Sequence, residues 1–424
     1  MTDLDQPLRV LITNNTLADR AGSELYVRDV ALALVKRGHH PVAYSPVLGD
    51  VADELRQHTI PVIDDLKQLS VAPDLIHGHH HHETMTAALH FPDTPALLLV
   101  HGWAPWQEEP FPFPNIMKYA AVDDLCRERL LTTDGINPND VKVILNFVDC
   151  ERFKQVRSLP VRPKTALVFS NYADAVAMPI QSACASLGIE TVDIYGHGSG
   201  KPCDRPEDIL ADYDIVFAKA RSALEAMASG CAVIVTDFAG IAGMVTTDNL
   251  QSLRRLNFGA RTLQTWALSE KRLRTEIEKY NAEEAGRVTQ WVRKHAHIDN
   301  AVDQLLDSYR ECLAAWQNNG AQISDRDRLF SAARYLRSIA PRVKLANQHA
   351  SEKEIADAQL DAMLLHLTRV EDCLATTETE LAVLKSKNSI EEGAAEEIEL
   401  IRPEEPAPSK LVEESKRTSH WWKK

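Results

Sequence analysis

The chain has 424 residues, of which 44% are hydrophobic and 25% are charged. A chain of this size can bury two hydrophobic cores and still carry further segments, so we expect a multi-domain globular protein. Its formal net charge of −14 argues against nucleic acid as a general partner. Half of that charge lies in residues 351–424, which hold 17 acidic and 10 basic residues.

The cysteines and the apolar runs predict where the protein resides. Seven scattered cysteines without a CxxC pair are typical of thiols in a reducing compartment. Residues 1–7 are polar, and no run approaches 18 apolar residues, so we expect neither a signal peptide nor a membrane span. The sequence therefore predicts a cytoplasmic protein.

Residues 1–156 are predicted to form a doubly wound, Rossmann-like α/β domain, because short apolar strands alternate with helices. The small-residue turn Ala21-Gly22-Ser23 would let the backbone approach a ligand, although one glycine in such a turn is a weak signal. Helices are expected from Leu25 to Arg37 and over 123–131. Strands are expected at 8–13, 40–45, 60–63, 75–77, 96–100, 120–122 and 141–145.

Two groups of histidines follow strands of this domain. The run 79–82 could suggest a metal site, but consecutive side chains diverge, so a polar loop facing a ligand is the better interpretation. His101 directly follows strand 96–100, at the sheet edge where doubly wound domains bind ligands. The alternative is a histidine that only packs a loop. The Pro-rich stretch 104–114 is expected to cover this edge as a mobile loop.

A Pro-rich and basic boundary at 157–164 opens a second α/β domain, predicted over 157–298. A glycine-rich turn, 196–201, and a glycine-containing loop, 237–245, are expected in it. Helices are predicted at 175–187, 206–213 and 268–292, and strands at 166–170, 191–195, 214–217 and 231–236.

The segment 216–240 of this domain is a strand, helix, strand unit whose helix ends at Gly230. The N-terminus of its helix would lie at the carboxyl edge of the sheet, where free backbone N–H groups attract anions. Lys219 and Arg221 stand beside that edge. The unit therefore favours a phosphate site, and the alternative is that both cations are solvated surface residues.

The C-terminal third changes character. Helices at 299–345 should pack back on the core, because 301–316 carries an apolar stripe. From Ala356 to Leu384 apolar residues alternate spacings of four and three, which predicts a coiled coil over 346–388 and self-association; the alternative is an amphipathic helix packed on its own domain. Residues 389–424 read as a disordered acidic tail, whose end, 420–424, could touch a membrane surface or be inert.

Several segments together resemble the family 4 type of glycosyltransferase with the GT-B fold, two Rossmann-like domains that face each other across a nucleotide-sugar cleft. The resemblance covers residues 8 to about 316. The matching pieces, in the family's order, are Ala21-Gly22-Ser23-Glu24 with the helix ending Arg37-Gly38-His39, Pro73-Asp74-Leu75-Ile76-His77, His101-Gly102, the run from Ile144 to Phe153, and the run from Leu224 to Val233.

The resemblance implies roles for matching positions. Glu225 corresponds to the second glutamate of the family's E-x7-E motif, which binds the ribose hydroxyls, and an ordinary helix glutamate is the alternative. Gly22 would lie near the donor phosphates, and His101 near the reacting sugar as the catalytic-site histidine. Further donor-side candidates are Lys219, Arg221, Ser222, Gly198 and Lys201, and acceptor-side candidates are His79, Trp103 and Asn146.

The resemblance also implies a reaction: transfer of a hexose, with retention and without metal or cofactor, from a nucleotide diphosphate sugar to a glycan or lipid-linked acceptor of envelope or exported polysaccharide. Two departures weaken it. Phe217 stands where the first motif glutamate is expected, and the usual basic pair is missing from 170–174. A degenerate scaffold acting through the coiled coil is therefore one alternative, and a nucleotide-sugar epimerase is another.

Overall fold

The computed structural model describes residues 6–388, apart from the side chains of residues 197, 321 and 384–388. The predicted tail and its membrane-contacting end lie outside this range. Contacts divide the chain into two units, with the boundary between Ile339 and Ala340. In the described part of the chain no helix is both long and apolar enough to cross a membrane.

The N-terminal half of the first unit is a parallel sheet of seven strands in the order β3-β2-β1-β4-β5-β6-β7. Its elements are β1 (Arg9–Thr13), α1 (Gly22–Lys36), β2 (His40–Tyr44), α2 (Asp50–Gln57), β3 (Val62–Ile63), β4 (Leu75–His79), α3 (His81–His90), β5 (Ala96–Val100), β6 (Ile116–Ala121), α4 (Asp124–Leu131) and β7 (Val141–Val143).

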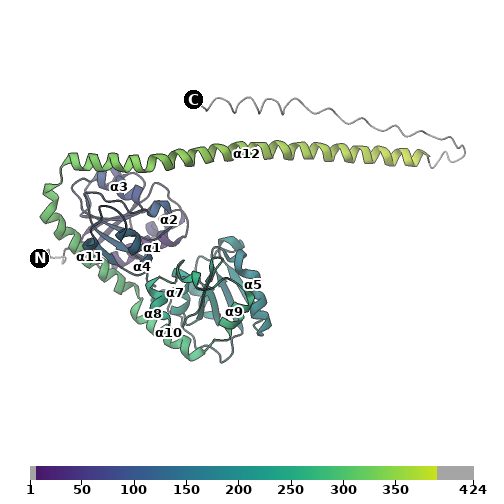
Figure 1. The fold of residues 1–424 in the computed structure, drawn as a ribbon, viewed down its shortest axis with the longest axis horizontal. Helices are drawn as coiled ribbons and strands as arrows, with labels where there is room; N and C mark the ends of the chain where they lie inside the picture. The colour runs from purple at the N-terminus through teal and green to yellow at the C-terminus, as the bar shows by residue number, and fades with distance from the viewer. Residues whose placement is uncertain (1–5, 389–424) are drawn as a thin grey trace. The chain divides into compact units, whose positions relative to one another are not determined.

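Both faces of this sheet are covered, as parallel sheets require. Alternation along β1 sends Val10 and Ile12 into a core shared with α1, α2, α4 and α11, and sends Leu11 into a core shared with α3. Figure 1 shows these helices around the first sheet. The chain order and the switch at β1 and β4 place the ends of these strands at a common ligand-binding edge.

The C-terminal half is a five-stranded sheet in the order β12-β11-β10-β8-β9. Successive side chains of β10 also point to opposite faces of this sheet. Ile215 and Phe217 pack in one cluster with α5 and α9, while Val216 and Ala218 pack in another with α7, α8 and α10. Its elements are β8 (Thr165–Phe169), α5 (Ala173–Ser186), β9 (Thr191–Tyr195), α6 (Pro206–Ile209), β10 (Ile215–Ala218), α7 (Ala220–Ala228), β11 (Ala232–Asp237), β12 (Gly240–Met244), α8 (Leu250–Arg255), α9 (Glu270–Ile277) and α10 (Ala282–His295).

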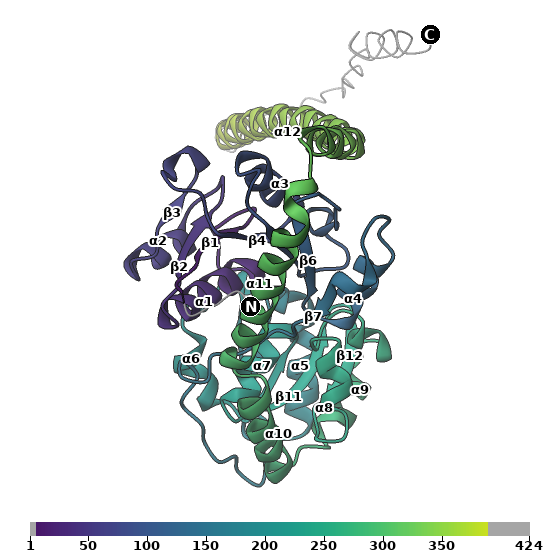
Figure 2. The same cartoon turned by 90° about the vertical axis from the view of Figure 1, so that its left-hand side faces the viewer.

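Helix α11 (Ile298–Asn319) returns the chain to the first half (Figure 2). Val302, Leu305 and Tyr309 are fully buried in the core beside α1. The last helix, α12 (Asp325–Asn388), starts in the first unit, where Tyr335 packs into the α3 core, and continues through the second unit. The predicted apolar stripe of α11 therefore packs on the N-terminal half.

The prediction of two doubly wound domains followed by a helical extension is confirmed, with local corrections. The expected loop 237–245 holds β12, which pairs antiparallel with β11. The expected single helix 268–292 is two helices, because Asn281 caps α10 by accepting a hydrogen bond from the Glu284 N–H group. The histidine run is no loop, since β4 extends through His79 and α3 begins at His81.

Candidate active site

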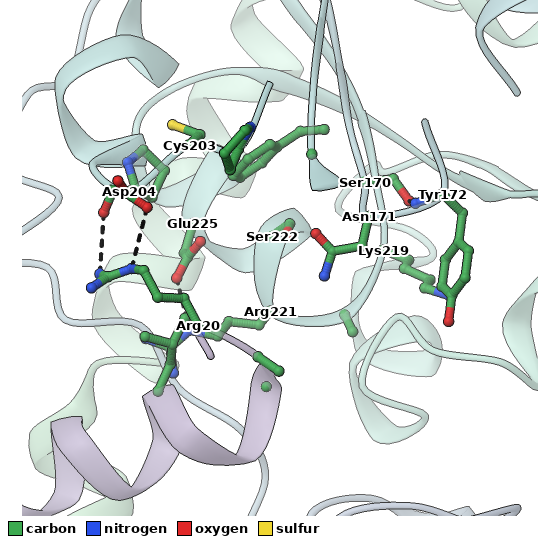
Figure 3. A pocket seen from close by; sticks show the side chains of 18 of the residues that line it. Arg20, Ser170, Asn171, Tyr172, Cys203, Asp204, Lys219, Arg221, Ser222 and Glu225 are labelled. Carbon is green, nitrogen blue, oxygen red and sulfur yellow. Dashed lines mark hydrogen bonds and ion pairs between the residues drawn. The ribbon is translucent and has the colours of Figure 1, made fainter. Parts of the chain in front are cut away.

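A cavity of about 270 Å³ lies between the two halves of the first unit. Gly22 and Arg20 line it from the N-terminal half, and Tyr172, Lys219 and Glu225 line it from the C-terminal half. Figure 3 shows Glu225 and Arg221 on one side of the cavity and Lys219 with Tyr172 on the other. The segment 216–240 therefore forms one wall of a cleft, as its sequence predicts.

Two helices begin at this cavity without a side-chain cap. Ala21 precedes α1 and Lys219 precedes α7, and neither side chain accepts a hydrogen bond from the first turn. The first N–H groups of an α-helix have no partner inside the helix, and its dipole is positive at this end. Gly22 and Ser222, in the first turns of these helices, both line the cavity. The wall is suited to an anionic group.

Arg221 is held between two carboxylates from different halves. Its Nε donates to Glu225 at 2.8 Å, and its guanidinium also pairs with Asp29 of α1. Asp29 also accepts a hydrogen bond from Arg28 Nε at 2.8 Å. Burial alone would raise the pKa of Asp29, but Arg221 and Arg28 outweigh it and lower that pKa. Arg221 thus joins the halves as well as facing the cavity.

Lys219 forms an ion pair with the fully buried Asp237. Its Nζ also lies 5.2 Å from the ring centre of Tyr172 and 5.7 Å from that of Phe238. Both rings are about half exposed, at 52% and 55%. The cation is therefore positioned by three neighbours at the edge of the C-terminal sheet.

Sequence reasoning missed two further cations of this cavity, Arg20 and Arg152. Arg20 pairs with Glu54 at 2.6 Å, and its Nη2 donates to the Asp204 carbonyl of the other half at 3.1 Å. Arg152 pairs with Glu207 at 2.8 Å. Arg20 directly precedes Ala21-Gly22, and Arg152 lies within the run 144–153. Their closeness to these two motifs is the only feature of the sequence that could have predicted them as site residues.

A second cavity, of about 350 Å³, shares Gly22, Ala220 and Arg221 with the first. His101 and Asn146 line it, so the structure brings these two predicted residues together with Gly22. The two cavities form adjoining compartments of one cleft.

The wall of the second cavity is organised by Glu108, which lies in the Pro-rich stretch. One carboxylate oxygen accepts from the His101 backbone N–H at 2.8 Å, and the other lies 3.2 Å from His80 Nε2. His80 Nδ1 accepts from the Asn15 N–H group, so Nε2 carries the proton that His80 donates to Glu108. Burial would raise the pKa of Glu108, but the hydrogen bond from His80 and the nearby His101 lower it.

Behind His101 runs a stack of buried imidazoles. The rings of His77 and His79 are 4.6 Å apart, and those of His79 and His101 are 4.7 Å apart. His79 Nδ1 lies 2.5 Å from His101 Nε2, and His77 Nδ1 lies 2.6 Å from the Tyr309 hydroxyl of α11. Burial lowers the pKa of His77 to about 3 and that of His101 to about 4. His101 is therefore an uncharged, oriented group at the cleft.

The other histidines of the run 79–82 have structural partners. His81 Nε2 donates to the Trp106 carbonyl at 2.9 Å, and its Nδ1 accepts from the Tyr335 hydroxyl at 2.6 Å. The Tyr335 oxygen in turn lies 2.7 Å from His82 Nδ1. Among the described residues, no group of three or more histidine, cysteine or acidic side chains has the geometry of a metal site.

Backbone strain gathers at the second cavity. Of the five non-glycine residues with positive φ in the described chain, His80, Ala220 and Asn257 line it, with φ of 62°, 50° and 53°. Such conformations cost about 1–3 kcal/mol and persist where surrounding structure enforces them, often at functional sites. This strain is an independent indication that the cavity is the functional part of the cleft.

Four predicted site residues lie apart from both cavities. His79 is fully buried behind His101, and Trp103 is 47% exposed in a loop after β5. Gly198 packs close to the start of α5, where a Cβ would come within 2.5 Å of the Asp174 carboxylate. Lys201 pairs by its backbone with Gly196. Neither Gly198 nor Lys201 is among the residues that line the cavities.

Comparisons with known proteins agree with this geometry. Residues 20–152, which carry Gly22, His101 and Asn146, match the family described as Glycosyltransferase Family 4. The match lies within the N-terminal half, so the likeness to this family applies to that half. No curated protein matches the chain.

Solved structures extend the likeness to both halves of the first unit. A glycosyltransferase from Rickettsia africae ESF-5 is 14% identical, with a TM-score of 0.52, over 72% of this chain and 99% of that one. Anabaena Alr3699/HepE, solved with UDP, is 13% identical, with a TM-score of 0.51, over 72% and 99%. At these identities the likeness concerns the fold, and the predicted GT-B fold is confirmed.

The structure shows where the two positions of the E-x7-E motif expected from the resemblance lie. Glu225 lines the first cavity, where the resemblance expects a ribose contact. Phe217, at the position expected for the first glutamate, is 1% exposed and belongs to the core between the sheet and α5. Its side chain lies on the face of β10 that packs against α5 and α9, so this position does not line the cleft.

Proposed function

We propose that the protein is a glycosyltransferase that moves a sugar from a nucleotide diphosphate sugar to a glycan or lipid-linked acceptor. The observation that supports this most is the first cavity, where two uncapped helix starts, four arginine or lysine side chains and Glu225 meet between the halves. The helix ends and the cations can bind the negatively charged diphosphate of a donor. The Glu225 carboxylate can accept hydrogen bonds from the neighbouring hydroxyls of its ribose.

The proposed reaction transfers a hexose with retention and without a metal ion. Catalysis would rest on holding donor and acceptor in line and on stabilising the departing diphosphate by the helix ends and by Lys219. His101 would face the reacting sugar from the second cavity. The acceptor class, envelope or exported polysaccharide, rests on the family resemblance.

Binding of nucleotides to the purified protein tests the proposal. Because HepE was solved with UDP, uridine nucleotides come first, followed by GDP and ADP and their sugars, in titration calorimetry. Glu225→Ala should weaken nucleotide binding by about 1.5–3 kcal/mol, the usual loss for hydrogen bonds to a charged group. Glu283→Ala, an exposed glutamate of α10, is the matched control. A folded protein that binds none of these nucleotides would refute the transferase.

A second candidate is a scaffold that self-associates through α12. The exposed positions Leu360, Leu367, Leu374 and Leu381 follow the coiled-coil seam, and the described residues of the second unit offer nothing to cover them. We propose a second copy of the chain as the partner. Leucine alternates along the seam with the β-branched residues Val370 and Thr377. This pattern favours a coiled coil of more than two helices.

The seam is tested in the full-length chain by light scattering after size-exclusion chromatography. The double change Leu367→Asp and Leu374→Asp should lower the mass to that of a monomer. Leu365→Asp is the matched control, because Leu365 is equally exposed but lies off the seam. A monomeric wild type, or a double variant that keeps the wild-type mass, would refute association through α12.

A further inference from the structure

Three side-chain oxygens around the second cavity are buried and have no hydrogen-bond partner. They are Tyr26 Oη on α1, Asn146 Oδ1 after β7 and Asn257 Oδ1 after α8. An unpaired buried polar group typically costs about 1–3 kcal/mol, so it calls for an explanation. Three such groups from three elements of both halves, lining one cavity, indicate a missing partner that offers several hydroxyl groups.

The position of Asn257 strengthens this. It has a φ of 53°, and the next residue, Phe258, accepts a hydrogen bond from the Ala220 N–H group. The turn that carries Asn257 is thereby tied to the start of α7, which both cavities share. The strained turn holds an amide against the cavity without giving its oxygen a partner.

The charged residues around the second cavity limit the charge of the group that can bind there. Glu24 and Glu108 line it and are 4% and 6% exposed. Against the effect of burial, the hydrogen bond from His80 and the nearby His101 lower the pKa of Glu108, which favours its charged form. The guanidinium of Arg221, which also lines it, is occupied by Asp29 and Glu225. A ligand group with its own negative charge would meet two carboxylates at short range, which is unfavourable in a poorly solvated site.

We propose that this cavity holds the uncharged sugar ring of the donor, with Tyr26 and Asn257 as residues that recognise its hydroxyls in place of the absent motif glutamate. This rests on the proposed transferase function, because the sugar enters the cavity from a nucleotide bound next door. It specifies the sugar as a neutral, polyhydroxylated ring and excludes uronic acids.

The test compares a nucleotide with its own sugar derivative, in titrations with UDP, UDP-glucose and UDP-glucuronate and with GDP and GDP-mannose. Tyr26→Phe and Asn257→Gly should each weaken binding of the neutral sugar nucleotide about fivefold, as expected for one lost hydrogen bond, and leave the parent nucleotide unchanged. Glycine keeps the positive φ of residue 257. UDP-glucuronate should bind at least tenfold more weakly than UDP-glucose if uridine is the base.

A structural role for these residues predicts different results. Tyr26→Phe removes a hydroxyl without a partner, so the melting temperature should not fall. Asn249→Ala is the matched control for Asn257. Asn249 precedes α8, the helix that Asn257 follows, but its amide has partners: Oδ1 accepts from the Thr246 N–H group and Nδ2 donates to the Met244 carbonyl. It should destabilise the protein and weaken nucleotide and sugar nucleotide equally.

Each outcome decides between the two proposals. Variants that bind the sugar nucleotide as the wild type does, or that lose nucleotide and sugar nucleotide together, would overturn the sugar pocket and leave the transferase standing. Equal affinity for UDP-glucuronate and UDP-glucose would do the same. A wild-type protein that binds none of the nucleotides would overturn both.

Discussion

The buried imidazole stack makes the stability of the N-terminal half sensitive to mild acid. His77 is fully buried, and burial lowers its pKa to about 3, while an unfolded histidine has a pKa of about 6.5. Between these values the unfolded chain binds a proton that the folded chain does not. Stability is therefore complete above about pH 6.5 and falls as the pH drops towards 3.

The size of the effect follows from linkage. At pH 5 a site with these two pKa values loses about 2 kcal/mol relative to pH 7.5. His101, with a pKa of about 4, contributes a similar loss of about 2 kcal/mol. Burial also pushes the pKa of His79 well below its usual value, so the third ring acts in the same direction. We expect a total of at least about 4 kcal/mol.

Urea denaturation at pH 7.5 and pH 5.0, followed by circular dichroism, measures this difference. His77→Gln should reduce the difference by about 2 kcal/mol, because one titrating site is removed. The exposed His90→Gln is the matched control and should leave it unchanged. If the His77 variant loses as much stability on acidification as the wild type, the stack is not the cause of the pH dependence.

Two substitutions test the contacts that shape the cleft. Gly196→Ala should lower the melting temperature and weaken nucleotide binding, because φ is 141° and a Cβ would come within 1.9 Å of the Ser170 carbonyl oxygen; an unchanged melting temperature would contradict this. Asp29→Asn should cost about 3 kcal/mol in urea denaturation, since it leaves Arg28 and Arg221 without a shared carboxylate. A cost below about 1 kcal/mol would place that pair among weak surface ion pairs.

The alternating layers could be predicted because apolar runs and helical stripes are local signals. The strand β12 was not predicted, because Gly240 and Gly243 are typical of a loop in the sequence. In the structure both lie in this strand, where each has a positive φ. Gly240 allows the backbone to approach Leu263, where a Cβ would come within 2.1 Å of the carbonyl oxygen. A glycine that serves a close approach cannot be told from a loop glycine in one sequence.

The site was predictable where a family motif or a local sequence pattern carried it, as with Lys219 and Arg221 of the strand, helix, strand unit. Glu225, Gly22 and His101 follow from family motifs, and each lines a cavity. Asp29 is a helix residue with no local signal, and its partner Arg221 is 192 positions away. Tyr26 and Asn257 are likewise marked by what they lack in the folded protein, a hydrogen-bond partner, and no sequence pattern reports that.

The altered motif leads to a last prediction, that restoring its glutamate does not restore the family's donor contact. Phe217 packs on the face of β10 that meets α5 and α9, whereas Val216 and Ala218 face the α7 side. Phe217→Glu would place an unpaired carboxylate in that core. Loss of the phenylalanine alone costs about 3–5 kcal/mol, and the buried charge adds to it.

Urea midpoints and the sugar-nucleotide titrations measure the outcome of Phe217→Glu together. Phe217→Leu should cost only about 1 kcal/mol, because it keeps an apolar group of similar size. A Phe217→Glu protein that is as stable as the wild type and binds the sugar nucleotide more tightly would show that position 217 reaches the cleft. In that case the substitution of phenylalanine for glutamate at position 217 would be the only change to the E-x7-E motif. If instead the variant is destabilised as expected, position 217 is a core position of the C-terminal half and cannot supply the donor contact that the family's first motif glutamate makes.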